Sequence, residues 1–499
     1  MEAKNFSDTG LYPVQFRVTW LWAVFPLAFF AVACVMFFIV WEAYAMVNLA
    51  AAAFAGLIVT SLVAKDMSAF WKSALRGMSS ELCAILALIL LVVGPFGNMM
   101  ARAGVAQGFV WLGSNIGMTG PLFVVFTFIA CSVVATATGT SLGTVFSGFP
   151  IFYPAGILLG ADPVFLAGAI LSGAMFGDKL SPISDSTIAS ATTQRYATKN
   201  ESADIGGVVA SRIKYSLVAA AGTIVLYLIF GAGLGSGAVI AGPEVLADFS
   251  NARGLIMLIP VAVLLTVAVI KRDIFIAVTF GLITGTLVGL ASGALQMSDI
   301  FSVEGGQAGG FLIAGVNGKL GLIGYLLGIC GIMGVLRESG TLDRLLDKLL
   351  NSSLAKTTAG SEWVNALGIM ITCSFIGSAN GPALIIFGPV ASDIGSKKGL
   401  HPYRRANIID GMVCSLPVNL PFTSAFIFIV IGVVEGLMST YDFITPIGPF
   451  ALAAATFHPI MLFVVFTVCI VTGWGRIYET KDGGMSKDPS QAWNAGRQS

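Results

Sequence analysis

"GDKLSPISDST", residues 177–187, is a strongly polar stretch in an otherwise apolar part of the chain. Two acids, Asp178 and Asp185, lie on either side of Pro182, and Lys179 follows the first acid. Proline lacks a backbone N–H and prevents a regular helix from running through the stretch. An ionisable side chain within a membrane costs about 2.5–3.5 kcal/mol even on a lenient insertion scale. The stretch therefore predicts a helix that is broken around a functional site.

The composition around this stretch is that of a membrane protein. The chain has 499 residues, of which 56% are hydrophobic and 11% are charged, and its mean hydropathy is +0.88. Apolar runs such as 19–40 and 253–270 reach the roughly 20 residues that cross a bilayer. We therefore predict an all-α polytopic membrane protein.

Other classes of protein find little support in the sequence. The net charge of +1 gives no sign of a nucleic-acid partner. The seven cysteines show no CxxC spacing, and two histidines are too few for a metal site. Because the sequence has no P-loop and no nucleophile–base pair, we predict neither ATP-driven transport nor an enzyme, and no cofactor apart from Na⁺ as a transported or coupling ion.

The two halves of the chain resemble each other weakly at an offset of about 235–240 residues. Each half shows three ordinary spans, two interrupted segments and a final span. The interruptions are "ATGTS" (137–141) within 120–158, the opening stretch within 163–193, "SANGP" (378–382) within 362–395, and "LPVNLP" (416–421) within 404–434. The arms around "ATGTS" are short for full crossings, which favours a re-entrant hairpin.

Five crossings and a hairpin in each half make the halves inverted repeats and place both termini on one side. All but four of the 27 Lys and Arg residues fall on that side, the exceptions being Arg102, Lys179, Arg253 and Lys319. The positive-inside rule then predicts a multi-pass protein of the cytoplasmic membrane with cytoplasmic N- and C-termini. The predicted parts are 1–19 (cytoplasmic), 20–232 (first repeat), 233–253 (external linker), 254–472 (second repeat) and 473–499 (cytoplasmic tail).

Two further segments carry simple predictions. Residues 342–354 alternate leucines and charges at helical spacing, which indicates an amphipathic helix at the membrane surface. The polar sequence from Tyr478 onward predicts a disordered tail.

Broken helices expose backbone carbonyls, which suit Na⁺, and amides, which attract anions. We expect Na⁺ and the proton to bind at Asp178 and Asp185. Lys179 either adjusts the charge of this site or pairs permanently with a carboxylate as a structural clip. The hydroxyl groups expected to line the site belong to Ser181, Ser184, Thr138, Thr140 and Ser141.

The breaks in the second half are polar but uncharged. They form a candidate substrate or second-ion site, and the side chains concerned are Ser378, Asn380, Asn419, Thr423 and Ser424. For Asn380 and Asn419 the alternative is that they only cap the ends of the broken helices. Asp410 precedes the second break, either as a buried accessory group or at the cytoplasmic edge.

The opening stretch closely resembles the signature of the NhaC-type sodium/proton antiporter family, which is similar to a wider ion transporter superfamily. The resemblance rests on Asp178, Lys179, Ser181, Ser184 and Asp185. It implies Na⁺ coupling, two hairpins with broken helices, a homodimer and an elevator motion. The first hairpin lacks the asparagine that the superfamily has at its tip, whereas "GSAN" in the second half keeps Ser378 and Asn380.

These observations together predict a secondary active transporter that exchanges Na⁺ for H⁺ across the lipid bilayer by alternating access, as a homodimer. The resemblance also includes malate–lactate antiporters and apparent amino-acid carriers. A Na⁺-coupled transporter of a small organic anion or amino acid therefore remains the alternative, and a passive ion channel is a more distant one.

Overall fold

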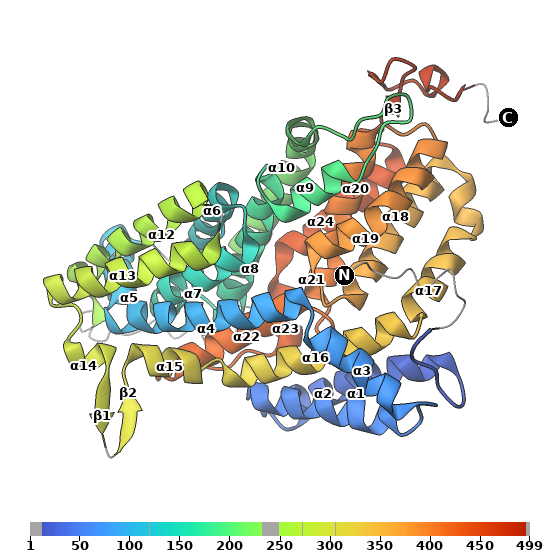
Figure 1. Ribbon diagram of the computed structural model, residues 1–499. Coiled ribbons are helices and arrows are strands. Elements are labelled where there is room, and N and C mark those ends of the chain that lie inside the picture. The colour runs from blue at the N-terminus through green and yellow to red at the C-terminus, as the bar shows by residue number, and fades with distance from the viewer. Residues whose placement is uncertain (1–11, 119, 232–248, 272, 305, 496–499) are drawn as a thin grey trace.

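The structure is a computed structural model that describes residues 12–118, 120–231, 249–271, 273–304 and 306–495. It is mainly helical, and its strands form two small antiparallel pairs (Figure 1). These pairs are β1 (Ser302–Glu304) with β2 (Gln307–Gly309) and β3 (Tyr478–Glu479) with β4 (Met485–Ser486). The predicted all-α polytopic class is therefore confirmed. Most of the predicted linker 233–253, and residues 1–11 of the N-terminal segment, lie outside the described residues.

Within these ranges, nine helices are long and apolar enough to cross a membrane, or ten if a bent pair counts as one more span. They are η2–α1–η3 (Trp20–Val40), α4 (Glu81–Arg102), α6 (Gly120–Thr138), α7 (Ser141–Leu158), α8 (Pro163–Leu180), α10 (Ile205–Phe230), η4–α12 (Ala252–Lys271), α13 (Ile274–Ser292) and α15–α16 (Phe311–Glu338), with α23 (Pro449–Ala455) and α24 (Phe457–Thr472) as the bent pair.

The remaining helices are shorter or more polar. They are α2 (Met46–Ser61), α3 (Met67–Met78), α5 (Val105–Asn115), α9 (Asp185–Thr192), α14 (Met297–Ile300), α17 (Thr341–Leu350), η5 (Ser353–Lys356), α18 (Thr358–Phe375), α19 (Asn380–Lys397), α20 (Pro402–Val413), α21 (Leu416–Asn419), α22 (Ala425–Met438) and η6 (Pro489–Gln491).

In the structure, a helix ends at each of the four predicted interruptions. In the first half α6 stops at Thr138 before α7 begins, and α8 stops at Leu180 before α9 begins. In the second half α18 and α19 are separated by residues 376–379, and α20, α21 and α22 are separated near Cys414 and Leu420. The breaks are therefore confirmed, while the inverted relation of the two halves stays a prediction. The final span predicted for the second half is itself bent by 53° between α23 and α24.

Helices α6 and α8 pack closely and position the first-half breaks. A Cβ atom added to Gly173 would lie 2.4 Å from the Phe128 carbonyl oxygen, and one added to Gly177 would lie 2.2 Å from that of Ser132. Only glycine permits such an approach of two helix backbones. The end of α8, which carries the opening stretch, is therefore held against the hairpin α6–α7.

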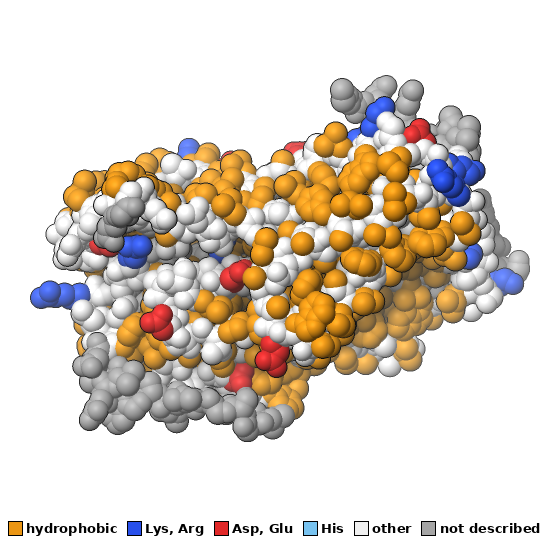
Figure 2. Space-filling model, turned by 90° about the horizontal axis from the view of Figure 1, so that it is seen from below, with side chains coloured by type: hydrophobic (Ala, Val, Ile, Leu, Met, Phe, Trp, Pro, Cys, Tyr) orange, Lys and Arg blue, Asp and Glu red, His pale blue; other side chains and the backbone are white. Residues whose placement is uncertain are grey.

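The outer surface is broadly apolar. Figure 2 shows one face covered largely by hydrophobic side chains, with Lys and Arg side chains toward its two ends. Large apolar residues such as Val32, Ile39 and Ile58 are exposed, as expected for side chains that face lipid.

The tail is ordered up to residue 495, so the predicted disorder from Tyr478 is wrong for the part of the tail that the structure describes. Tyr478 forms a β-bridge with Leu400, and the Glu479 side chain is fully buried. Its carboxylate accepts hydrogen bonds from the backbone N–H groups of Ala197 (2.9 Å) and Thr198 (2.9 Å). The polar composition of the tail did not predict its order, because the contacts that hold the tail come from loops distant in the sequence.

His401 begins α20 beside this tail. Its Nδ1 accepts a hydrogen bond from the Tyr403 N–H at 3.2 Å. Burial, together with the charges of Arg405 and Lys199, lowers the pKa of His401 to about 4. The ring is therefore neutral at pH 7, in agreement with its role as an acceptor.

Candidate functional site

The break after α8 follows directly from its sequence. Ser181 ends the helix with its N–H still directed to the Gly177 carbonyl (3.1 Å), and Pro182 has no N–H to continue the pattern. The chain turns and restarts as α9 at Asp185, an acid in the first turn, where the positive end of the helix dipole stabilises it. Ser184 precedes it, with its hydroxyl 3.1 Å from that of Ser186.

The tip of the hairpin α6–α7 contacts this break. Gly139 has a positive φ of 68°, and a Cβ there would lie 2.7 Å from the Ile183 side chain and 3.1 Å from Ser181 Oγ. Thr140 caps α7 by accepting a hydrogen bond from the Gly143 N–H (3.2 Å), and Thr138 Oγ1 donates to the Val134 carbonyl (2.9 Å). The two interruptions of the first half, predicted separately, thus form one continuous polar region.

The two acids of the opening stretch occupy different environments. Asp178 is 7% exposed, and the hydroxyl groups of Ser141 and Ser184 interact with its carboxyl group. Asp185 is exposed, and its Cβ lies 3.6 Å from the position that a Cβ on Gly381 would occupy. One carboxylate is therefore enclosed and the other is accessible beside the second-half hairpin α18–α19.

Lys179 pairs with a carboxylate that lies far away in the sequence. Its Nζ is 3.1 Å from Asp410 Oδ2 and donates to the Asp410 carbonyl at 2.6 Å. Both side chains are fully buried. Of the two roles considered for Lys179, the geometry matches pairing with a carboxylate, but the partner is Asp410 on α20 and not an acid of the opening stretch. Of the two positions considered for Asp410, the structure shows the buried one.

Arg212 on α10 completes this ion network. Its Nη1 is 2.8 Å from Asp410 Oδ2 and also donates to the Lys179 carbonyl (3.0 Å). The same guanidinium reaches Thr187 Oγ1 (3.2 Å) and Ser190 Oγ (3.0 Å) on α9. Arg212 therefore joins the end of α8, the start of α9 and the middle of α20.

The sequence alone did not single out Arg212. The predicted topology placed Arg212 among the basic residues on the side of the two termini, yet its side chain is fully buried. The sequence did contain one indication. Placing a charged arginine seven residues into an apolar helix is energetically unfavourable unless an acidic side chain pairs with it. What the sequence could not show was its partner, Asp410, nearly two hundred positions away.

The polar groups of the second half are largely occupied by internal hydrogen bonds. Ser378 Oγ donates to the Pro417 carbonyl (2.7 Å), and the Asn419 amide donates to the carbonyls of Ala453 (2.8 Å) and Thr456 (2.9 Å). The Asn380 amide donates a hydrogen bond to Cys414 Sγ. Ser424 caps α22 by accepting a hydrogen bond from the Ile427 N–H. These side chains therefore stabilise the second-half breaks through contacts within the protein.

Three neutral buried oxygen atoms of the predicted site residues have no hydrogen-bond partner among the described residues. They are Ser181 Oγ, Asn419 Oδ1 and Thr423 Oγ1. Neutral oxygen atoms of this kind are the ligands that hard monovalent and divalent cations prefer. The uncommitted polar atoms near the breaks are therefore better suited to a cation than to an anion.

A family model matches the first part of the chain. The model described as "Na+/H+ antiporter family" matches residues 9–232, which include the hairpin α6–α7 and both acids of the opening stretch. This part, a little less than half of the chain, is therefore similar to the Na⁺/H⁺ antiporter family. The match agrees with the resemblance predicted from the opening stretch, and it supports a secondary transporter.

Relatives extend the similarity beyond the first half. The Malate-2H(+)/Na(+)-lactate antiporter of Bacillus subtilis is 29% identical over 344 residues, which cover 66% of this chain and 70% of the relative. The Na(+)/H(+) antiporter NhaC of Alkalihalophilus pseudofirmus is 26% identical over 287 residues, which cover 56% of this chain and 60% of that protein. Among solved structures, the YdaH transporter of Alcanivorax borkumensis matches 77% of this chain and 85% of its own, at 15% identity and a TM-score of 0.35.

Proposed function

We propose that this protein exchanges Na⁺ for H⁺ by alternating access, and that the two cations compete for one site at the α8–α9 break. The observation that carries the proposal is the joint placement of Asp178, Asp185 and the ion network of Lys179, Asp410 and Arg212. Lys179, Arg212 and Asp410 together carry one net positive charge. When Asp178 and Asp185 are both ionised, the five side chains together carry one net negative charge.

A single monovalent cation neutralises such a cluster. Moving an uncompensated charge through a low-dielectric region is unfavourable, so the cluster is stable in transit with either one Na⁺ or one proton. Binding both at once would restore an excess charge. This competition is the physical basis of exchange, and it favours a ratio of one Na⁺ per proton.

The proposed roles of the two acids follow from how exposed their side chains are. Asp185, which is exposed, receives the incoming cation, and Asp178, which is enclosed, holds it. The unpartnered Ser181 Oγ and the neighbouring hydroxyl group of Ser184 supply further oxygen ligands. Thr138, Thr140 and Ser141 border the same region from the hairpin α6–α7.

The alternative is a Na⁺-coupled transporter of a small organic anion or amino acid. The 29% identity to the malate/lactate antiporter favours it. Against it, the amide donors expected to hold a carboxylate in the second half are already used within the protein.

The deciding experiment is a measurement of intravesicular pH in proteoliposomes without organic solute, with an outward gradient of Na⁺ or of K⁺. Acidification with Na⁺ that is absent with K⁺ and in empty liposomes is the expected result. A pH that does not change would overturn simple exchange, and Na⁺-driven uptake of carboxylates and amino acids would then test the alternative.

We further propose that the protein is a homodimer in the cytoplasmic membrane with both termini in the cytoplasm. Basic residues flanking the spans on one side support this orientation. Labelling of single cysteines placed in the tail and in the β1–β2 hairpin, in intact and in opened cells, tests it. Labelling of the tail in intact cells by an impermeant reagent would contradict it.

A further inference from the structure

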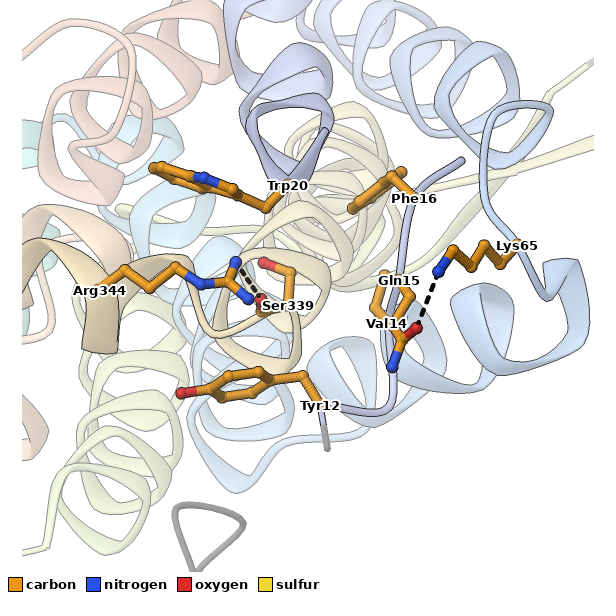
Figure 3. Close-up of a pocket in the computed structure, with 8 residues that line it drawn as sticks. All are labelled: Tyr12, Val14, Gln15, Phe16, Trp20, Lys65, Ser339 and Arg344. Carbon is orange, nitrogen blue, oxygen red and sulfur yellow. Dashed lines mark hydrogen bonds between the residues drawn. The ribbon is translucent and has the colours of Figure 1, made fainter. Parts of the chain in front are cut away.

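A cavity of about 210 Å³ lies between the N-terminal segment and α17, away from the ion site (Figure 3). Tyr12 and Trp20 contribute aromatic rings to its wall, and Lys65 and Arg344 contribute positive charges. The proposed exchange does not use this cavity.

The Arg344 guanidinium is held in a defined position. Its Cζ lies 5.2 Å from the ring centroid of Tyr12 and 5.3 Å from that of Trp20, distances typical of cation–π contacts. Nη1 donates to the Ser339 carbonyl at 3.3 Å. Its other N–H groups have no partner among the described residues, so donors remain for a ligand.

A glycine permits this arrangement. Gly340 begins α17 with a positive φ of 70°, and a Cβ there would lie 2.3 Å from the ring of Tyr12. Any other residue would therefore displace the ring that supports Arg344.

The described residues that line the cavity carry only positive formal charges, and no carboxylate is among them. Within the described part of the chain, Lys65 Nζ donates one hydrogen bond, to Gln15 Oε1 at 3.3 Å (Figure 3). Asp343 and Asp347 act on the Tyr12 hydroxyl from outside the cavity lining. Two cationic side chains in a lining without a carboxylate indicate an anionic ligand.

The location selects the kind of anion. Trp20 begins the first span, and tryptophan is enriched where a helix leaves the bilayer. Helix α17 is amphipathic, with Leu342 buried and Asp343 and Lys348 exposed, as for helices that lie along a membrane surface. Basic pockets at this depth bind lipid head groups. We propose that the cavity binds the phosphate group of an anionic phospholipid.

The test measures binding of phosphatidylglycerol to the purified full-length protein by native mass spectrometry, with phosphatidylcholine as the neutral reference. A basic residue near a membrane surface contributes about 1 kcal/mol, so K65Q and R344Q are each expected to weaken binding about fivefold. K72Q is the matched control, because Lys72 is an exposed lysine on neighbouring α3, and it should leave binding unchanged.

Two further measurements distinguish a lipid site from a site for free phosphate and from diffuse surface charge. Inorganic phosphate at the same concentration should not compete; if it displaces the lipid completely, the site is one for free phosphate and the lipid assignment is wrong. An equal loss in K72Q and K65Q would also overturn the proposal, because it would indicate diffuse surface charge. Because K65Q changes an exposed side chain, it keeps the test valid if R344Q fails to fold. The measurement needs no transport, so its outcome is independent of the proposed exchange.

Discussion

The break between α8 and α9 and the break between α20 and α22 have similar backbones but different chemistry. The first carries Asp178, Lys179 and Asp185, whereas the second carries amides and hydroxyl groups whose donors are mostly used internally. The second half does contribute a charge, Asp410, but that carboxylate is directed to Lys179 and Arg212 of the first half. The first break therefore holds the acids that we propose as the exchange site, and the second is a neutral, internally bonded break.

The largest expected effect comes from removing the charge at the first break. D185N and D178N should each reduce Na⁺-dependent proton movement in proteoliposomes to the level of empty vesicles, because an amide cannot carry the proton. D393N is the matched control, since Asp393 is an exposed acid on α19. Unchanged coupling in D185N would show that the assignment of Asp185 is wrong.

The next effect concerns the ion network that links the halves. R212Q leaves Asp410 with Lys179 alone, and breaking a buried pair in this way costs about 3–5 kcal/mol. We expect a clearly lower melting temperature in detergent and slower exchange. The double variant R212Q/D410N should be less destabilised than the sum of the two single variants, because each single variant already loses the Arg212–Asp410 pair and the double variant loses it only once. Lys179 remains without its carboxylate partner in D410N and in the double variant alike. Strict additivity would contradict the role of Asp410 as the partner.

A smaller effect is expected at the second break. T423V removes a buried oxygen without a partner and should weaken the apparent affinity for Na⁺ up to about tenfold, if that oxygen is a ligand. S378A removes the hydrogen bond to the Pro417 carbonyl and should cost about 1 kcal/mol of stability with the Na⁺ affinity unchanged. An unchanged affinity in T423V would restrict the ion site to the first half.

The smallest effect is stabilisation by the ion itself. Na⁺ at about ten times its dissociation constant should stabilise the folded protein by about 1.4 kcal/mol relative to K⁺. The shift in melting temperature should vanish in D178N and persist in S378A. A shift that persists in D178N would place the bound Na⁺ elsewhere.

The positions of the breaks could be predicted because their causes are local. Pro182, Gly139 and Pro417 each interrupt helical hydrogen bonding or permit a turn whatever surrounds them. The membrane class likewise follows from the length of the apolar runs, because the bilayer fixes how many residues a span needs. The ordered tail was missed because Glu479 is buried by loops that no local pattern connects to it.

By itself, the sequence determined the membrane class, the places where the helices break and the resemblance to the Na⁺/H⁺ antiporter family. Only the tertiary structure decided which charges meet there. Asp410 and Arg212 look like ordinary residues of separate helices, and an ion pair depends on distances of a few ångströms between distant segments. Such distances are set by the packing of all the helices together, which is why the partner of Lys179 is found in the other half of the chain.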